Sequence, residues 1–101
     1  MLTHMVVWKY KNDLAQVVRE EHITRLRALS QLIPDIISLN LGFDTLHLAR
    51  SYDTGLVAVF RDRAALDAYT AHPVHQQVAE FGRSISEHIA SVDFVDENDK
   101  C

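Results

Sequence analysis

Three side chains suited to acid–base chemistry stand close together in the segment AYTAHPVHQQV, residues 68–78. A neutral histidine can accept a proton near pH 7, and a tyrosine hydroxyl can donate a hydrogen bond to a developing oxyanion. Tyr69 and His75 could therefore serve as hydrogen-bond donor and general base. The alternative is structural: Tyr69 and His75 belong to the core, and His72 marks the junction of two helices at Pro73.

A further histidine, His4, lies in a segment with a strand pattern. Residues 2–10, LTHMVVWKY, are rich in β-branched and aromatic residues. Alternation along a strand places His4 on the same face as Val6, Trp8 and Tyr10. If helices cover that face, His4, Tyr69 and His75 converge on one pocket, where His4 is an auxiliary hydrogen-bonding group.

Other kinds of site have little support in the sequence. His72 and His75 are separated by Pro73, and no cysteine or carboxylate beside them completes a set of metal ligands. No serine stands in a nucleophile-elbow motif, and the glycines at 42, 55 and 82 form no phosphate-binding loop. We therefore expect neither a metal nor a cofactor.

Length and charge limit the classes of function. The chain has 101 residues, which predicts one domain, residues 1–96, with a disordered tail at 97–101. The net charge is −4, and no stripe of lysine and arginine suggests a nucleic-acid or membrane surface. The lone cysteine, Cys101, cannot form a disulfide within the chain. With no signal peptide or membrane span evident, we expect a cytoplasmic protein.

The remaining periodicity predicts an alternation of strands and helices. Asp13 and Gln16 suggest an N-cap and capping box for a helix that runs to Pro34. Its apolar stripe contains Leu14, Val17, Val18, Leu26, Leu29, Leu32 and Ile33, with His22 among them. Strands are predicted at 36–43, 54–60 and 88–95, and the strand at 54–60 is expected to be central, whereas 44–53 is either a loop or a strand extension.

A proline divides the second helical region. Asp62 is a suitable N-cap for a short helix, and this helix should end at His72 because the residue before a proline avoids the α conformation. Pro73 suits the first turn of the next helix, whose apolar stripe is Val74, Val78, Phe81 and Ile85.

These elements predict an α+β, ferredoxin-like β-α-β-β-α-β fold with a four-stranded antiparallel sheet. The helices lie on one face of that sheet. Because Met5 and Val7 make the other face apolar too, we expect a partner on it, and a second copy of the chain forms a homodimer there.

Four segments together resemble the stress-responsive dimeric α/β-barrel (Dabb) family: THMVVWKYK, VAVFRDRAALDAY, HPVH and VDFVD. The resemblance spans essentially the whole chain. It implies a barrel closed between the sheets of two subunits, which is a dimeric α/β barrel. Many members have no established activity or are described as stress-related, whereas a few fold a linear polyketide by intramolecular aldol chemistry.

The cyclase members imply roles for particular residues. By resemblance, His75 acts as the base, Tyr69 holds and polarises the substrate, and His4 matches a histidine near the start of the first strand. Thr54 replaces a further cyclase histidine, which speaks against identical chemistry. His22 stands where the cyclases have an aromatic wall residue, and this predicts a more polar pocket beside the first helix.

The predicted pocket is apolar with a few polar groups, as small-molecule sites usually are. Bulky Trp8 is expected to reduce its volume. Besides the catalytic residues His75, Tyr69 and His4, we predict the following substrate-binding residues: Val6, Trp8, Leu26, Leu56, Ala58, His72 and Val78.

Two main functions and one lesser one follow from the sequence. The first is binding or conversion of a small apolar carbonyl or polyketide-like molecule by cofactor-independent cyclase- or lyase-type chemistry. The second is a non-catalytic, stress-related homodimer in which the same residues serve packing. A cofactor-free monooxygenase is the lesser alternative.

Overall fold

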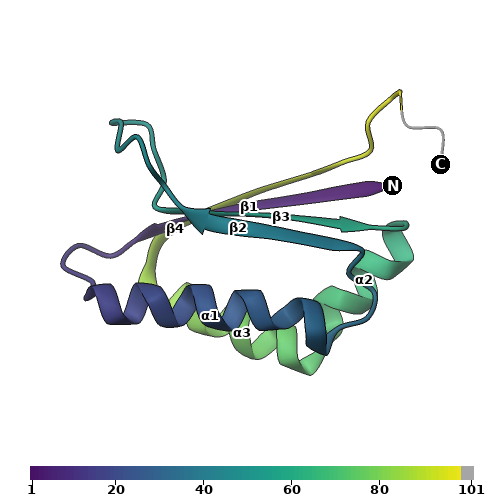
Figure 1. Cartoon of the computed structure of the whole chain (residues 1–101), viewed down its shortest axis with the longest axis horizontal. Helices are drawn as coiled ribbons and strands as arrows, with labels where there is room; N and C mark the ends of the chain where they lie inside the picture. The colour runs from purple at the N-terminus through teal and green to yellow at the C-terminus, as the bar shows by residue number, and fades with distance from the viewer. Residues whose placement is uncertain (99–101) are drawn as a thin grey trace.

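The computed structural model describes residues 1–98 as one antiparallel sheet with helices on a single face (Figure 1). The strand order is β2-β3-β1-β4, which is the predicted ferredoxin-like arrangement with β3 in the interior of the sheet. The elements in chain order are β1 (Leu2–Tyr10), α1 (Gln16–Leu32), β2 (Ser38–Phe43), β3 (Thr54–Phe60), α2 (Arg63–Ala71), α3 (Pro73–Ile85) and β4 (Ser86–Phe94).

One prediction falls at the end of the chain. The predicted disordered tail extends to Cys101, and its residues 99–101 lie outside the described residues. Within residues 1–98, no helix is both long and apolar enough to cross a membrane.

The position of β1 between β3 and β4 decides what each of its side chains contacts. Val6 lies opposite Leu56 on β3 and Ser91 on β4, and all three face the helices. The next residue, Val7, lies opposite Gly55 and Ala90 on the other face. The core therefore forms between the first face and the helices, where Leu29, Ile33 and Phe60 are fully buried. Each such side chain stabilises the fold by about 1.5–3 kcal/mol.

The predicted apolar stripe of the first helix packs in the core except at Val17 and Leu32. His22, Leu26 and Leu29 are buried, as the periodicity indicated. Val17 is 71% exposed and Leu32 is 53% exposed. At about 100° per residue, Val17 lies on the side of the helix opposite the buried residues, and Leu32 lies at the edge of the buried face.

The predicted N-cap at Asp13, with Gln16 as its capping-box partner, is also wrong. Helix α1 begins at Gln16, Ala15 occupies the N-cap position, and no side chain caps the helix. Asp13 adopts the left-handed conformation with φ 64°, in the turn that joins β1 to α1. Aspartate tolerates the left-handed conformation. Asp13 therefore belongs to the turn and does not cap the helix.

The junction between α2 and α3 forms as predicted. The Asp62 carboxylate accepts a hydrogen bond from the backbone N–H of Ala65 at 2.9 Å and caps α2. His72 has an extended backbone, and Pro73 begins α3. The His72 ring nitrogen Nδ1 accepts a hydrogen bond from the backbone N–H of Val74 at 3.1 Å, so His72 is the N-cap of α3.

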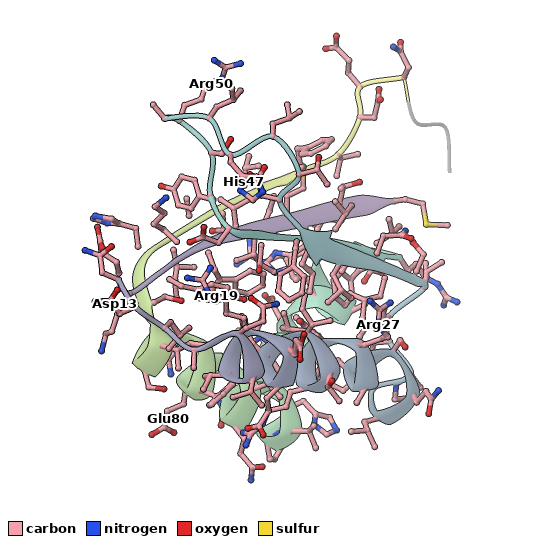
Figure 2. The ribbon with its side chains drawn as sticks, turned by 60° about the vertical axis from the view of Figure 1, so that its left-hand side comes forward. Asp13, Arg19, Arg27, His47, Arg50 and Glu80 are labelled. Carbon is pink, nitrogen blue, oxygen red and sulfur yellow. The ribbon has the colours of Figure 1, made fainter. Side chains whose placement is uncertain are left out.

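The segment 44–53, which the sequence left open, is a loop. It stands on the side of the sheet away from the helices (Figure 1). Figure 2 shows His47 and Arg50 on this loop, with Glu80 of α3 at the opposite side of the molecule. Asp53 ties the end of the loop to β1, because its backbone N–H donates to the Trp8 carbonyl and its carboxylate accepts from the Tyr10 N–H, both at 2.8 Å.

The sheet face opposite the helices, here called the bare face, is apolar at its centre. No helix within residues 1–98 covers it (Figure 1). Val92 is 54% exposed there, and Phe94 is also exposed. The apolar residues of the bare face are Met5, Val7, Val57, Val59, Ala90, Val92 and Phe94.

The cap of α2 can be tested by mutation. We expect Asp62→Ala to lower the free energy of unfolding by about 1 kcal/mol, because the Ala65 N–H loses its partner. Asp67→Ala is the matched control, since it removes only an exposed ion pair with Arg63 and should cost less than about 0.5 kcal/mol. Urea unfolding at one protein concentration measures both, and equal losses would contradict the capping role.

Candidate functional site

A mostly apolar cavity of about 190 Å³ lies between the sheet and the helices. Strands β1, β3 and β4 form one wall, and α1, α2 and α3 contribute the other. It is lined by His4, Val6, Trp8, Leu26, Leu56, Tyr69, His75, Val78, Ala79, Ile89 and Ser91.

Most of the predicted pocket residues line this cavity, but Ala58 and His72 do not. Ala58 is fully buried, so its small side chain is covered by the core and does not reach the cavity. The His72 ring is engaged in capping α3 through its Nδ1. His72 therefore has the structural role that was the alternative to a pocket residue, because it lies at the junction of the two helices.

Three lining residues were not predicted from the sequence, namely Ala79, Ile89 and Ser91. Ile89 and Ser91 pair with Trp8 and Val6 across the β1–β4 ladder. Alternation within β4 indicated that they share a face. Which face that was depends on the register between β4 and β1, and no pattern within β4 reveals that register.

One end of the cavity is polar because His4, Tyr69 and His75 meet there. The ring centroids of Tyr69 and His75 are 4.2 Å apart, and those of Tyr69 and His4 are 6.0 Å apart. These residues come from β1, α2 and α3. A small molecule in the cavity can reach all three, so acid–base chemistry on one bound group is geometrically feasible.

His75 is half-buried, and its hydrogen bond defines which nitrogen is free. Its Nδ1 lies 3.2 Å from the Thr70 carbonyl oxygen. A carbonyl only accepts hydrogen bonds, so Nδ1 carries the proton and Nε2 holds the lone pair of the neutral ring. Burial lowers the pKa of His75, and the hydrogen bond to Thr70 opposes this shift. The ring is therefore neutral at pH 7 and can act as a base.

Tyr69 is almost completely buried and keeps its proton. Burial raises the pKa of Tyr69 to about 12, because the phenolate would be poorly solvated. The hydroxyl is thus a hydrogen-bond donor throughout the physiological pH range. On its other side the ring packs against Phe60, with centroids 4.9 Å apart.

His4 has a carboxylate partner that the sequence analysis did not identify. Its Nδ1 contacts the Asp93 carboxylate on β4, directly across the ladder. The carboxylate accepts from Nδ1–H and orients the ring. The signal was present in the segment VDFVD, but only the strand register brings Asp93 beside His4.

His22 does not make the pocket more polar, which corrects the expectation drawn from the resemblance. It is fully buried behind Trp8, outside the cavity lining. Its ring makes edge-on contacts with Trp8 and Tyr10, at centroid distances of 4.9 and 5.6 Å. Trp8 separates His22 from the cavity.

Thr54 belongs to the same buried cluster. The Tyr10 hydroxyl lies 2.7 Å from both His22 Nδ1 and Thr54 Oγ1. His22 Nε2 has no hydrogen-bond partner among residues 1–98. Burial lowers the pKa of His22 to about 4, and the nearby Arg25 charge contributes to this shift. His22 is therefore neutral at pH 7.

Metal-binding side chains do not gather at this site. Within residues 1–98, no three His, Cys, Asp or Glu side chains are placed to share an ion. His4 and His75 are held instead by the Asp93 carboxylate and the Thr70 carbonyl.

The buried His22 predicts a loss of stability in acid. The pKa of His22 is about 4 in the folded chain against 6.5 in the unfolded chain, so protons favour the unfolded state. This contribution is fully present above pH 6.5 and is lost as the pH falls toward 4. Between pH 7 and 4.5, we expect the wild type to lose about 2–3 kcal/mol more than His22→Phe.

Urea unfolding at the two pH values measures this difference. The control is His88→Phe, because His88 is exposed on β4 and its replacement should leave the acid loss of the wild type unchanged. An equal acid loss in the wild type and in His22→Phe would show that His22 titrates normally.

Comparison with known proteins places this geometry in a family. A family model described as the stress responsive A/B barrel domain, Dabb, matches residues 2–96. Among proteins of curated function, none matches the chain.

Solved structures share the fold. A dimeric ferredoxin-like protein of unknown function from Jannaschia sp. CCS1 is 27% identical with a TM-score of 0.80, covering 94% of this chain and 98% of its own. One from Thermobifida fusca YX is 24% identical with a TM-score of 0.84, covering 92% and 88%. The hydroxynitrile lyase from Passiflora edulis is 19% identical with a TM-score of 0.86, covering 96% and 94%. At the identities of the last two, the likeness shows the fold alone.

The family match extends over nearly all of the described chain, and the topology, with helices on one face of a β2-β3-β1-β4 sheet, agrees with these structures. The chain belongs to the stress responsive A/B barrel domain family, Dabb.

Proposed function

We propose that the cavity binds a small apolar carbonyl compound and that His75, Tyr69 and His4 carry out acid–base chemistry on it without a cofactor. The observation that supports this most is the convergence of these three side chains at one end of an otherwise apolar cavity. An apolar pocket with a few convergent polar groups is the usual form of a small-molecule site.

His75 is the general base in this proposal. Its Nε2 removes a proton from the carbon next to the substrate carbonyl, since Nδ1 is held by the Thr70 carbonyl. The lowered pKa of His75 keeps this nitrogen unprotonated at neutral pH. A positioned base of this kind accelerates proton transfer by about 10²–10⁴-fold.

Tyr69 stabilises the negative charge that forms on the carbonyl oxygen. Its raised pKa keeps the hydroxyl protonated, so it donates a hydrogen bond as the enolate develops. The resulting carbanion equivalent can attack a second carbonyl, as in an aldol cyclisation. Run in reverse, the same groups assist cleavage of a carbon–carbon bond.

His4 is an auxiliary hydrogen-bonding group, oriented by Asp93. The carboxylate accepts from Nδ1–H and leaves Nε2 to accept a hydrogen bond from the ligand, while the proton that His75 Nε2 removed returns from His75 to the product. Asp93 acts here as a positioning residue, because it touches His4 rather than the substrate. Support for lyase-type chemistry in this fold comes from the Passiflora edulis protein, which is a hydroxynitrile lyase.

Deuterium exchange tests the catalytic roles without knowledge of the natural substrate. With 2-hexanone in D₂O, we expect the wild type to accelerate exchange of the protons next to the carbonyl, measured by ¹H NMR. His75→Gln should lower this rate by about 10²-fold or more, because the base is lost. Tyr69→Phe should lower it by about 10²–10³-fold, because the enolate loses its donor.

The matched control for this experiment is His88→Gln, which changes an exposed histidine that does not line the cavity. It should exchange at the wild-type rate. Wild-type exchange in His75→Gln would exclude His75 as the base.

The second candidate function is that of a non-catalytic homodimer. It is favoured by the contact of Tyr69 with Phe60, which is ordinary core packing. In that case Tyr69→Phe and His75→Gln change only the stability, by about 0.5–3 kcal/mol. Measuring unfolding alongside exchange distinguishes the two functions.

Both candidates include a homodimer formed through the bare face. The apolar side chains there gain burial if a second copy covers them, and a small domain benefits most from such added burial. A hollow of about 180 Å³ between β1 and β4, lined by Met5, Val7, Ala90, Ser91 and Val92, can receive side chains of the partner. The proteins from Jannaschia and Thermobifida are described as dimeric.

A charged residue on the bare face should separate the subunits. We expect Val92→Asp to convert the dimer into a monomer, because the carboxylate would be buried without a partner. Val17→Asp is the control, since Val17 is also an exposed valine but lies on α1. Sedimentation velocity measures the mass of each. If the Val92→Asp protein remained dimeric, the interface would have to lie on a surface other than the bare face.

A further inference from the structure

We propose that Trp8 sets the greatest length of ligand that the cavity accepts, and that His22 and Gly82 hold it in that position. This inference rests on the proposed function, since it takes the cavity to be a ligand site. It narrows the substrate class to carbonyl compounds with either a single ring or a short chain.

The cavity has a direction, with a polar end at His4 and an apolar end at Trp8. Both residues are on the same face of β1, four residues apart, which corresponds to about 13 Å along the strand. Val6 lies between them on the floor of the cavity. A ligand whose carbonyl is bound by Tyr69 therefore extends its apolar part along β1 toward the indole of Trp8.

The Trp8 side chain cannot move away from the cavity, because α3 and the His22 ring pack against its other side. A Cβ atom added to Gly82 would lie 3.1 Å from both Trp8 Nε1 and His22 Nε2, so the helix backbone is already in close contact with both rings. The indole meets the His22 ring edge-on, at an interplanar angle of 89°. The hydrogen bond between the Tyr10 hydroxyl and His22 Nδ1 fixes His22 in turn.

The volume of the cavity limits the size of the ligand. Pockets for drug-sized ligands enclose about 300–1,000 Å³, whereas an apolar cavity of about 150 Å³ accommodates benzene. The cavity here encloses about 190 Å³. It therefore suits one ring, or a chain of similar volume, together with the carbonyl. A long linear polyketide does not fit while Trp8 is present.

A homologous series of 2-alkanones, from 2-butanone to 2-undecanone, tests the length limit. Binding is followed by ¹H–¹⁵N NMR titration of the intact protein. In the wild type, affinity should rise about fourfold with each added CH₂ and then fall once the chain reaches Trp8. In Trp8→Leu this maximum should move to longer ketones, and in Trp8→Phe it should move in the same direction by less.

Two variants make the test specific. Val6→Ala widens the floor of the cavity without opening its end, so the maximum should stay at the wild-type chain length. Gly82→Ala acts in the opposite direction to Trp8→Leu. Because His22 is enclosed, the added Cβ displaces the indole toward the cavity, and the longest ketone that binds the wild type should lose at least threefold in affinity.

The proposal would be overturned if affinity peaked at the same chain length in the wild type, Trp8→Leu and Trp8→Phe. It would also be overturned if none of the ketones showed saturable binding. If Trp8→Leu lacks a dispersed spectrum, Trp8→Phe and Gly82→Ala decide the outcome. The catalytic proposal fails separately: a length limit set by Trp8, without deuterium exchange, would establish a binding site that has no acid–base activity.

Discussion

The strict alternation of side chains along β1, held between β3 and β4, is the constraint on which the rest of the structure depends. On one face this strand supplies His4, Val6 and Trp8, which are respectively the polar end, the floor and the apolar end of the cavity. On the other face it supplies Met5 and Val7 to the bare face. A slip of one residue in the pairing would exchange these two sets, so the site and the apolar surface exist only in this register.

Behind the cavity, the buried cluster of Tyr10, His22 and Thr54 contributes rigidity rather than chemistry. Two short hydrogen bonds join its members, but His22 Nε2 has no partner within residues 1–98. Such an atom costs about 1–3 kcal/mol. The fold accepts this cost in a position where an apolar ring could also pack. What His22 provides there is a firm support for the indole.

Much of the fold and of the site could be predicted from local pattern. Alternation identified the cavity face of β1, and Pro73 identified the helix junction, because both depend only on neighbouring residues. The pairing of His4 with Asp93 could not be predicted, since it requires the register of two strands far apart in the chain. The N-cap predicted at Asp13 was wrong because aspartate also favours a left-handed turn, and the connection between β1 and α1 places Asp13 in such a turn.

The break between α2 and α3 has a geometric effect that concerns both Tyr69 and His75. In one continuous helix, residues six positions apart are turned about 120° from each other around the axis, so the two rings would point to different surroundings. Here the extended backbone of His72 starts a new helical axis at Pro73, and the rings meet at 4.2 Å. The break at Pro73 thus turns the His75 side chain toward Tyr69. In this segment, the same break that ends α2 also brings two residues of the site together.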